Sequence, residues 1–173
     1  MDTKLLSAVI TAAIIAVALV LMWLGWRNRL KRQSDVAPLP AVPAETGSPA
    51  AHAEGQYVTT TTGGDWLDRV AVHSLGIRTN ATLAVYPHGV LFDRSGAPAL
   101  YIPASSLAGV RQESGMAGKF VEKDGLLVLT WNHGAHELDT GFRTRRAADK
   151  DTLQAALQEL ISSAPAADAS SGK

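Results

Sequence analysis

The sequence predicts a mainly β domain of about seven antiparallel strands with one C-terminal α-helix, preceded by one N-terminal transmembrane helix. Three observations lead to this fold class. Residues 5–26 form an apolar run without a single charge. Residues 56–143 contain short β-branched and aromatic segments separated by turn residues, which is typical of antiparallel strands. Residues 153–161 then place apolar side chains at helical spacing.

The apolar run at residues 5–26 is long enough to cross a bilayer. At about 1.5 Å per residue it extends roughly 33 Å, against a hydrocarbon core of about 30 Å. Trp23 and Trp26 stand at its C-terminal end, where indoles favour the headgroup boundary. A signal peptide would have a shorter apolar region and would end in small residues. We therefore predict a membrane anchor rather than a cleaved signal.

The basic segment at residues 27–32 predicts the orientation of the anchor. It carries Arg27, Arg29, Lys31 and Arg32, whereas Lys4 is the only basic residue before the apolar run. Because such cations remain on the cytoplasmic side, we expect the N-terminus outside and the domain in the cytoplasm. The same cations could hold anionic lipid headgroups at about 1 kcal/mol each. Setting the topology is the simpler interpretation.

Composition divides the rest of the chain into three parts. Residues 33–55 are rich in Pro, Ala, Gly and Ser and predict a semi-extended linker. Residues 56–163 form the predicted domain, and residues 164–173 a disordered tail. From residue 36 onward there are 11 basic and 14 acidic residues, a net charge of −3, which does not suit a nucleic-acid partner. The chain has no cysteine, which excludes disulfides and thiolate metal sites.

The strands are predicted from β-branched and aromatic runs bounded by turn residues. The first five candidates are Tyr57–Thr62, Ala81–Tyr86, Val90–Phe92, Leu100–Ile102 and Leu107–Gln112.

The last strands are predicted as two hairpins. Asp124-Gly125, the preferred dipeptide of a tight turn, is expected to join Lys119–Glu122 to Leu126–Trp131. A turn at residues 132–134 then leads into a final, half-buried strand. On this strand Leu138, Thr140 and Phe142 share one face, and Glu137, Asp139 and Arg143 the other.

One helix is predicted after the last strand. Its apolar stripe is formed by Leu153, Ala156, Leu157, Leu160 and Ile161. We expect Thr144 to be the N-cap, and Pro165 follows the end of the stripe. Such a helix has to bury its stripe against the sheet.

This order of elements resembles the pleckstrin-homology (PH) superfold. With Val-Tyr-Pro-His-Gly-Val at residues 85–90 and Leu-Ala-Gly-Val at residues 107–110, the chain is similar to PH-like single-pass membrane proteins of actinobacteria. Members of that family sometimes carry labels such as transporter or export protein. One anchor helix cannot form a transport pathway by itself, so the resemblance implies a fold and a membrane location rather than transport.

The chain departs from lipid-binding PH domains at two places. Their first hairpin carries several basic residues that hold inositol phosphates, whereas residues 62–69 here contain two acids and one base. The tryptophan of their C-terminal helix is also missing. The first departure argues against phosphoinositide recognition.

No pattern in the sequence predicts a catalytic, cofactor-binding or metal site. His133 and His136 are i and i+3, a spacing that points to opposite faces of a strand. Ser105, His88 and Asp93 supply the residue types of a hydrolase triad, but no nucleophile elbow accompanies them. Residues 114–119 lack the first glycine and the hydroxyl of a phosphate loop, so we interpret them as a flexible loop.

The expected function is therefore that of a membrane-tethered, non-enzymatic interaction module with a protein partner. Arg143, Arg145 and Arg146 precede the helix and are candidate contacts for an acidic partner or anionic lipid. Trp131 is expected in the core, and Trp66 either in the core or exposed as a docking aromatic. The alternative is an accessory subunit of a transporter or envelope complex, held through its membrane helix.

Overall fold

The computed structural model describes residues 3–33 and 37–164. Residues 1–2, 34–36 and 165–173 lie outside this description, and with them Pro165 and nearly all of the predicted tail. The chain divides into two units, Met1–Asp35 and Val36–Lys173, which are described separately.

The first unit is one long helix, α1 (Thr3–Gln33). Its 19-residue apolar span, Ser7–Gly25, has no residue buried against other parts of the protein. The hydroxyl of Thr11 donates a hydrogen bond of 2.9 Å to the carbonyl oxygen of Ser7, so the helix itself satisfies this polar group. By length and composition α1 is able to cross a membrane.

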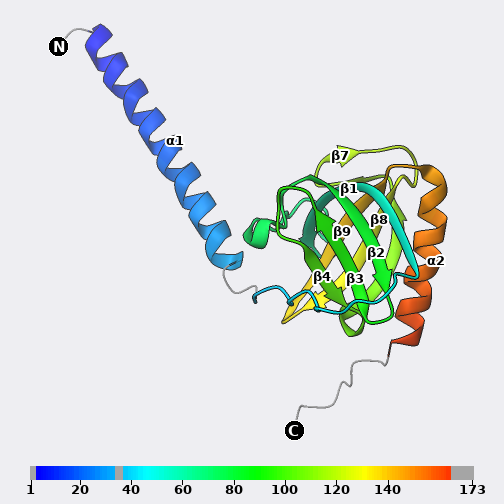
Figure 1. Cartoon of the computed structure of the whole chain (residues 1–173). Helices are drawn as coiled ribbons and strands as arrows, with labels where there is room; N and C mark the ends of the chain where they lie inside the picture. Colours follow the sequence, from blue (N-terminus) through cyan, green and yellow to red (C-terminus); the bar gives the residue numbers. More distant parts are fainter. Residues whose placement is uncertain (1–2, 34–36, 165–173) are drawn as a thin grey trace. The chain divides into compact units, whose positions relative to one another are not determined.

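The second unit contains a seven-stranded antiparallel sheet in the order β4-β3-β2-β1-β9-β8-β5 (Figure 1). Its strands are β1 (Ala51–Thr62), β2 (Thr79–Tyr86), β3 (Gly89–Arg94), β4 (Leu100–Pro103), β5 (Leu107–Glu113), β8 (Leu126–His133) and β9 (His136–Thr144). The short 3-10 turns η1 (Val72–Ser74) and η2 (Ala104–Ser106) follow β1 and β4. The predicted fold class, a mainly β domain with one C-terminal helix, is confirmed.

Strand β1 joins the two halves of the sheet. Its first half pairs with β2, from Ala51 opposite Val85 to Tyr57 opposite Thr79. Its second half pairs with β9, and the register shifts between Tyr57 and Thr59. The strand begins at Ala51, so the expected domain boundary at residue 56 lies inside β1. Glu54 and Gly55 therefore belong to the sheet rather than to a linker.

The predicted hairpin around Asp124-Gly125 is wrong. Residues 119–120 form β7, which pairs with β6 (Gly115–Met116) and not with β8. Strand β8 pairs with β5 and β9 instead. Asp124 does adopt the left-handed conformation of a turn, with φ of 56°. Its amide donates to Ser114 Oγ at 3.0 Å, so the turn closes against the end of β5 rather than joining two paired strands.

The core lies between the inner face of the sheet and helix α2 (Ala147–Ser163), which runs alongside the sheet in Figure 1. Leu153 and Leu157 are fully buried, and Ala156 and Ile161 pack against the same core, which confirms the predicted stripe. The predicted N-cap is wrong, because Thr144 remains in β9, opposite Gly55, and Arg146 is the N-cap residue.

The loop between β1 and β2 is fixed by a buried arginine. Arg94 donates hydrogen bonds to the carbonyl oxygens of Pro98 at 2.7 Å and Ser74 at 2.8 Å. Its guanidinium carbon lies 4.8 Å from the ring centroid of Tyr57, within cation–π range. Ser74 and its neighbour His73 both have positive φ values, of 58° and 55°, which L-residues rarely adopt. Arg94 therefore stabilises a strained part of the loop.

Part of the predicted linker packs on the domain. Leu39 contacts the hydrophobic core, and the carbonyl oxygen of Ala37 lies 2.7 Å from Nε2 of His133. His133 is buried and its ring lies 5.5 Å from that of Trp131. At least Ala37 and Leu39 of the predicted linker therefore contact the folded domain.

Candidate functional site

A cavity of about 410 Å³ lies on the outer face of the sheet, on the side away from α2, and we call it the outer-face cavity. Its floor is formed by residues of β1, β5, β8 and β9, among them Thr61 and Arg111. The loop after β1 and the β6–β7 hairpin border it with Trp66 and Met116. These two borders are joined, because the amide of Ala117 donates to the carbonyl oxygen of Trp66 at 2.7 Å.

A charged network crosses the floor of the outer-face cavity. Arg111 of β5 reaches over β8 to Asp139 of β9, with N–O distances of 3.0 and 2.8 Å to the two carboxylate oxygens. The hydroxyl of Thr130 donates to Asp139 at 2.6 Å and also accepts a hydrogen bond from Arg111 at 2.6 Å. The amide of Gly64 contributes a longer contact of 3.4 Å to Asp139. This arrangement is the bidentate geometry in which arginine binds carboxylates best.

The two partners of this network differ in exposure. The side chain of Asp139 is 4% exposed, whereas that of Arg111 is 43% exposed and also contacts Glu113 at 3.0 Å. Burial alone would raise the pKa of Asp139, but the hydrogen bonds from Arg111 and Thr130 outweigh it and hold that pKa below its usual value. The same hydrogen bond raises the pKa of Arg111. Both groups are therefore charged at neutral pH.

The cavity also contains an unsatisfied hydroxyl and apolar walls. Thr61 is fully buried, and its hydroxyl has no hydrogen-bond partner among the residues that the structure describes. Met116 and Val128 line the cavity with apolar surface, and Trp66 is 44% exposed at its border. Trp66 is therefore an exposed aromatic, whereas Trp131 is fully buried, as the sequence predicted for it.

The three arginines proposed as partner contacts all form ion pairs near the start of α2. Arg143 pairs with Glu122 at 2.7 Å and Arg145 with Glu54 at 2.9 Å. Arg146 pairs with Asp149 in the first turn of the helix, at 3.0 Å. Arg143 and Arg145 line a polar groove of about 810 Å³, to which both signs of charge contribute. Their location is compatible with partner contact, but their charges are already balanced locally.

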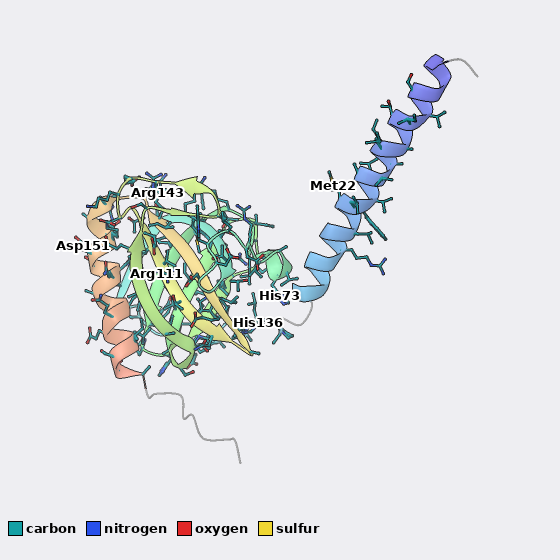
Figure 2. The ribbon with its side chains drawn as sticks, turned by 180° about the vertical axis from the view of Figure 1, so that it is seen from behind. Met22, His73, Arg111, His136, Arg143 and Asp151 are labelled. Carbon is teal, nitrogen blue, oxygen red and sulfur yellow. The ribbon has the colours of Figure 1, made fainter. Side chains whose placement is uncertain are left out.

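Figure 2 shows how far the candidate residues lie from one another. Arg143 lies at the end of the domain where α2 begins, Arg111 on the face of the sheet, and His136 at the opposite end of β9. His133 and His136 face each other across the β8–β9 turn and so share a face, contrary to the expectation from their spacing. Among the described residues, no group of three histidines or carboxylates is arranged to hold a metal ion.

The remaining residues examined in the sequence fall on separate elements. Asp93 is in β3, His88 in the turn before it, and Ser105 in η2. The carbonyl oxygen of His88 accepts a hydrogen bond from the hydroxyl of Tyr101, at 2.9 Å. Residues 114–119, expected to be a flexible loop, form most of the β6–β7 hairpin that borders the outer-face cavity.

The residues predicted to set the membrane topology lie in the C-terminal part of α1. Trp23 is exposed, and the guanidinium carbon of Arg27 lies 5.2 Å from its ring centroid. Trp26, Arg29, Lys31 and Arg32 belong to the same helix, and their side chains lie outside the description.

Comparison with known proteins decides the family. The model of a family described as bacterial PH domain-like matches residues 36–158, which is most of the chain and nearly all of the second unit. The protein belongs to the bacterial PH domain-like family. The match begins at residue 36, so the family includes the part of the linker that packs on the PH-like domain. No curated protein matches the chain.

Two solved structures align with much of the chain. A chain of the 8S snRNP assembly intermediate aligns with a TM-score of 0.53 and 11% identity, over 78% of this chain and 97% of that one. A structure of Vav1 inhibited by an allosteric inhibitor aligns with a TM-score of 0.40 and 18% identity, over 79% of this chain and 32% of the Vav1 chain. At 11% identity the similarity to the first structure concerns the fold alone.

No sequence pattern predicts the outer-face cavity of the PH-like domain. The sequence pattern places Asp139 on the face of the last strand opposite Leu138, but no pattern singles out Arg111. The two residues are 28 positions apart and come together only because β5 and β9 flank β8. Both strands carry further charged residues, Glu113 on β5 and Glu137 and Arg143 on β9, so no single charge in the sequence marks this pair.

Proposed function

We propose that this protein is a membrane-tethered, non-enzymatic interaction module that binds a protein partner through its PH-like domain. The observation that carries the proposal is an unpaired edge of the sheet next to the outer-face cavity. Strand β5 ends the strand order and pairs only with β8 among the described strands. Such an edge offers backbone donors and acceptors to an added strand of a partner.

The surroundings of β5 favour an added strand. Residues 109–113 pair in regular register with β8, and Ala108, at the register shift before them, presents a small, exposed side chain. Gln112 forms a hydrogen bond with Gln154 of α2, so the inner side of β5 is closed by the helix. A partner strand would therefore have its outward side chains near the outer-face cavity, where Trp66 is exposed.

Helix α1 supports the tether. Most large apolar side chains of its span are more than half exposed in the protein alone, as for Ile14 and Leu21. Contact with lipid removes the cost of exposing these side chains to water. The basic residues after the span favour an N-terminus outside and a PH-like domain in the cytoplasm. A tether of this kind raises the concentration of the domain near partners in the same membrane. The basic segment could add weak contact with anionic headgroups.

The first experiment is site-specific photo-crosslinking of the full chain in cells. A crosslinking amino acid replaces Ala108 on β5, and a matched variant carries it at Ala155, an exposed alanine on α2. We expect one defined protein to be crosslinked from position 108 and not from position 155. Equal crosslinking from both positions, or crosslinking of this chain to itself only, would contradict the proposal.

A second experiment separates the module from an accessory subunit. Residues 5–26 are replaced by an unrelated transmembrane helix of equal length, and reporters that are active on one side of the membrane are fused after Lys173. An interaction module retains the crosslink from position 108 after the exchange, with its C-terminus in the cytoplasm. Loss of the crosslink on exchange of the helix would favour a subunit held through its anchor.

A further inference from the structure

We propose that the outer-face cavity receives the side chain of an arginine or lysine from the partner segment that binds at β5. This inference specifies the partner chemistry of the proposed function and rests on it. Four features carry the inference: the charge of the cavity, its apolar walls, an unsatisfied hydroxyl and its position beside the edge strand.

The charge of the cavity is negative. Three carboxylates line it, those of Glu113, Asp124 and Asp139, against one cation, Arg111. Asp139 is occupied by Arg111, which also contacts Glu113. The side chain of Glu113 remains 45% exposed and is available to a second cation. The net charge of −2 attracts a basic side chain and repels an acidic one.

The walls of the cavity suit a charged group on an aliphatic stem. Met116 and Val128 are nearly fully buried and turn apolar surface to the cavity. Trp66 is exposed at the border, where an indole face could accept a cation. Arginine and lysine carry methylene stems that pack on apolar walls while the charged end reaches polar groups.

An unsatisfied hydroxyl lies at the floor. The hydroxyl of Thr61 is buried and, within the described residues, has no hydrogen-bond partner. An unpaired buried hydroxyl destabilises a protein unless a ligand supplies the partner. A guanidinium or ammonium group supplies donors, which the lone pairs of the Thr61 hydroxyl and of the Glu113 carboxylate are able to accept.

The cavity adjoins the strand edge at which the partner is proposed to bind. Arg111 and Glu113 belong to β5 itself and alternate with Gln112, which faces α2. In a strand added to β5, every second side chain would likewise lie on the outer face. One of those side chains can therefore enter the cavity while the backbone pairs with β5.

The test is a titration of the full chain, labelled with ¹⁵N and held in micelles, with short probe peptides. The probe is the acetylated and amidated pentapeptide Thr-Val-Arg-Val-Thr, and the matched control peptide has citrulline, a neutral analogue, in place of arginine. The readout is the shift of the indole N–H signal of Trp66, assigned with the variant Trp66→Phe. One side chain in an open cavity gives an affinity on the order of 1 mM. We expect the arginine peptide to bind about 5–10 times more tightly than the citrulline peptide.

Two variants locate the binding in the outer-face cavity. Glu113→Gln is expected to weaken the arginine peptide roughly 2–5-fold, as for a partly exposed ion pair. Its matched control is Glu122→Gln, which also removes the partner of an arginine but lies outside the cavity. Thr61→Val is expected to weaken binding about 3–10-fold while the folding stability is unchanged or higher, because valine removes an unsatisfied hydroxyl.

Three results would overturn the inference: equal binding of the arginine and citrulline peptides, equal effects of Glu113→Gln and Glu122→Gln, or binding of free arginine amide as tight as that of the peptide. The last result would indicate a small cation as the guest. Failure of the inference is distinguishable from failure of the proposed function. If the peptides fail these tests but the crosslink from position 108 persists in Glu113→Gln and Thr61→Val, the proposed function stands. Only the entry of a basic side chain into the outer-face cavity is then refuted.

Discussion

Replacing Arg111 with glutamine removes the cation from a carboxylate that is almost completely buried. Asp139 then retains the hydroxyl of Thr130 at 2.6 Å and the more distant amide of Gly64 at 3.4 Å. Removing one partner of a buried ion pair costs about 3–5 kcal/mol. Because Arg111 is 43% exposed and water screens part of its charge, we expect a loss of about 2–3 kcal/mol.

The loss should depend on pH in a defined direction. In the wild type the pKa of Asp139 is lowered, so its contribution to stability is complete above the usual carboxylate pKa, near 4, and disappears as the pH falls through the lowered value. In Arg111→Gln, burial is no longer opposed by the cation and raises the pKa of Asp139. The carboxyl then becomes neutral on mild acidification. The difference between the two proteins is therefore largest near pH 7 and shrinks toward pH 4.

Urea unfolding of the full chain in micelles, followed by the fluorescence of the buried Trp131, measures this difference. A loss of 2–3 kcal/mol corresponds to a decrease of roughly 1–2 M in the urea midpoint. The control is Arg143→Gln, since Arg143 is equally exposed, at 42%, but its partner Glu122 is 59% exposed. The control should lose much less, because water screens an exposed ion pair. Equal losses in the two variants at pH 7 would refute the assignment of an uncompensated buried charge.

Three further predictions concern other parts of the domain. Burial raises the pKa of Tyr57 to about 12, so its tyrosinate absorbance should appear near that pH. The free energy of unfolding should fall as the pH rises from about 10 toward 12. Titration of Tyr57 near pH 10 would contradict this. Gly55→Ala should lower the free energy of unfolding by more than about 3 kcal/mol, because a Cβ would meet a backbone oxygen of β9 at 2.2 Å. Gly109→Ala, which has open space around the new methyl, should be nearly neutral in the same urea assay. Leu157→Ala should lower the free energy of unfolding by about 2–5 kcal/mol, since Leu157 is fully buried. Its control, Gln158→Ala at an exposed position, should lose less than about 0.5 kcal/mol. Equal thermal unfolding of the two variants would exclude packing of α2 on the core.

The sequence predicted those features that depend on local periodicity. The apolar stripe of α2 and the burial of Trp131 follow from patterns that a single element contains. The seven strands of the main sheet follow from β-branched runs between turns. Each of these is decided within a window of about ten residues, where the pattern of one face is complete.

The features that were missed depend on partners distant in the chain. Ala51–Gln56 has a low β propensity, and it is a strand because β2 pairs with its whole length and β9 with its last two residues. Asp124-Gly125 forms a turn, but β8 pairs with β5 and β9 and not with residues 119–120, so the local turn signal predicts the wrong strand pair. The network of Arg111 and Asp139 requires the order β5-β8-β9, which no local pattern contains.

Pairing of β1 with β9 has a consequence for the synthesis of the protein. Gly55 lies opposite Thr144, 89 residues later in the chain. At about 5–20 residues per second, the ribosome needs roughly 4–18 s to synthesise the chain between Gly55 and its partner Thr144. Helix α1 has left the ribosome long before that time, and insertion of α1 into a membrane would precede closure of the sheet. Throughout this interval one side of β1 remains an unpaired strand edge, so the nascent chain is most exposed to misassembly after its first helix is complete and before its last strand is made.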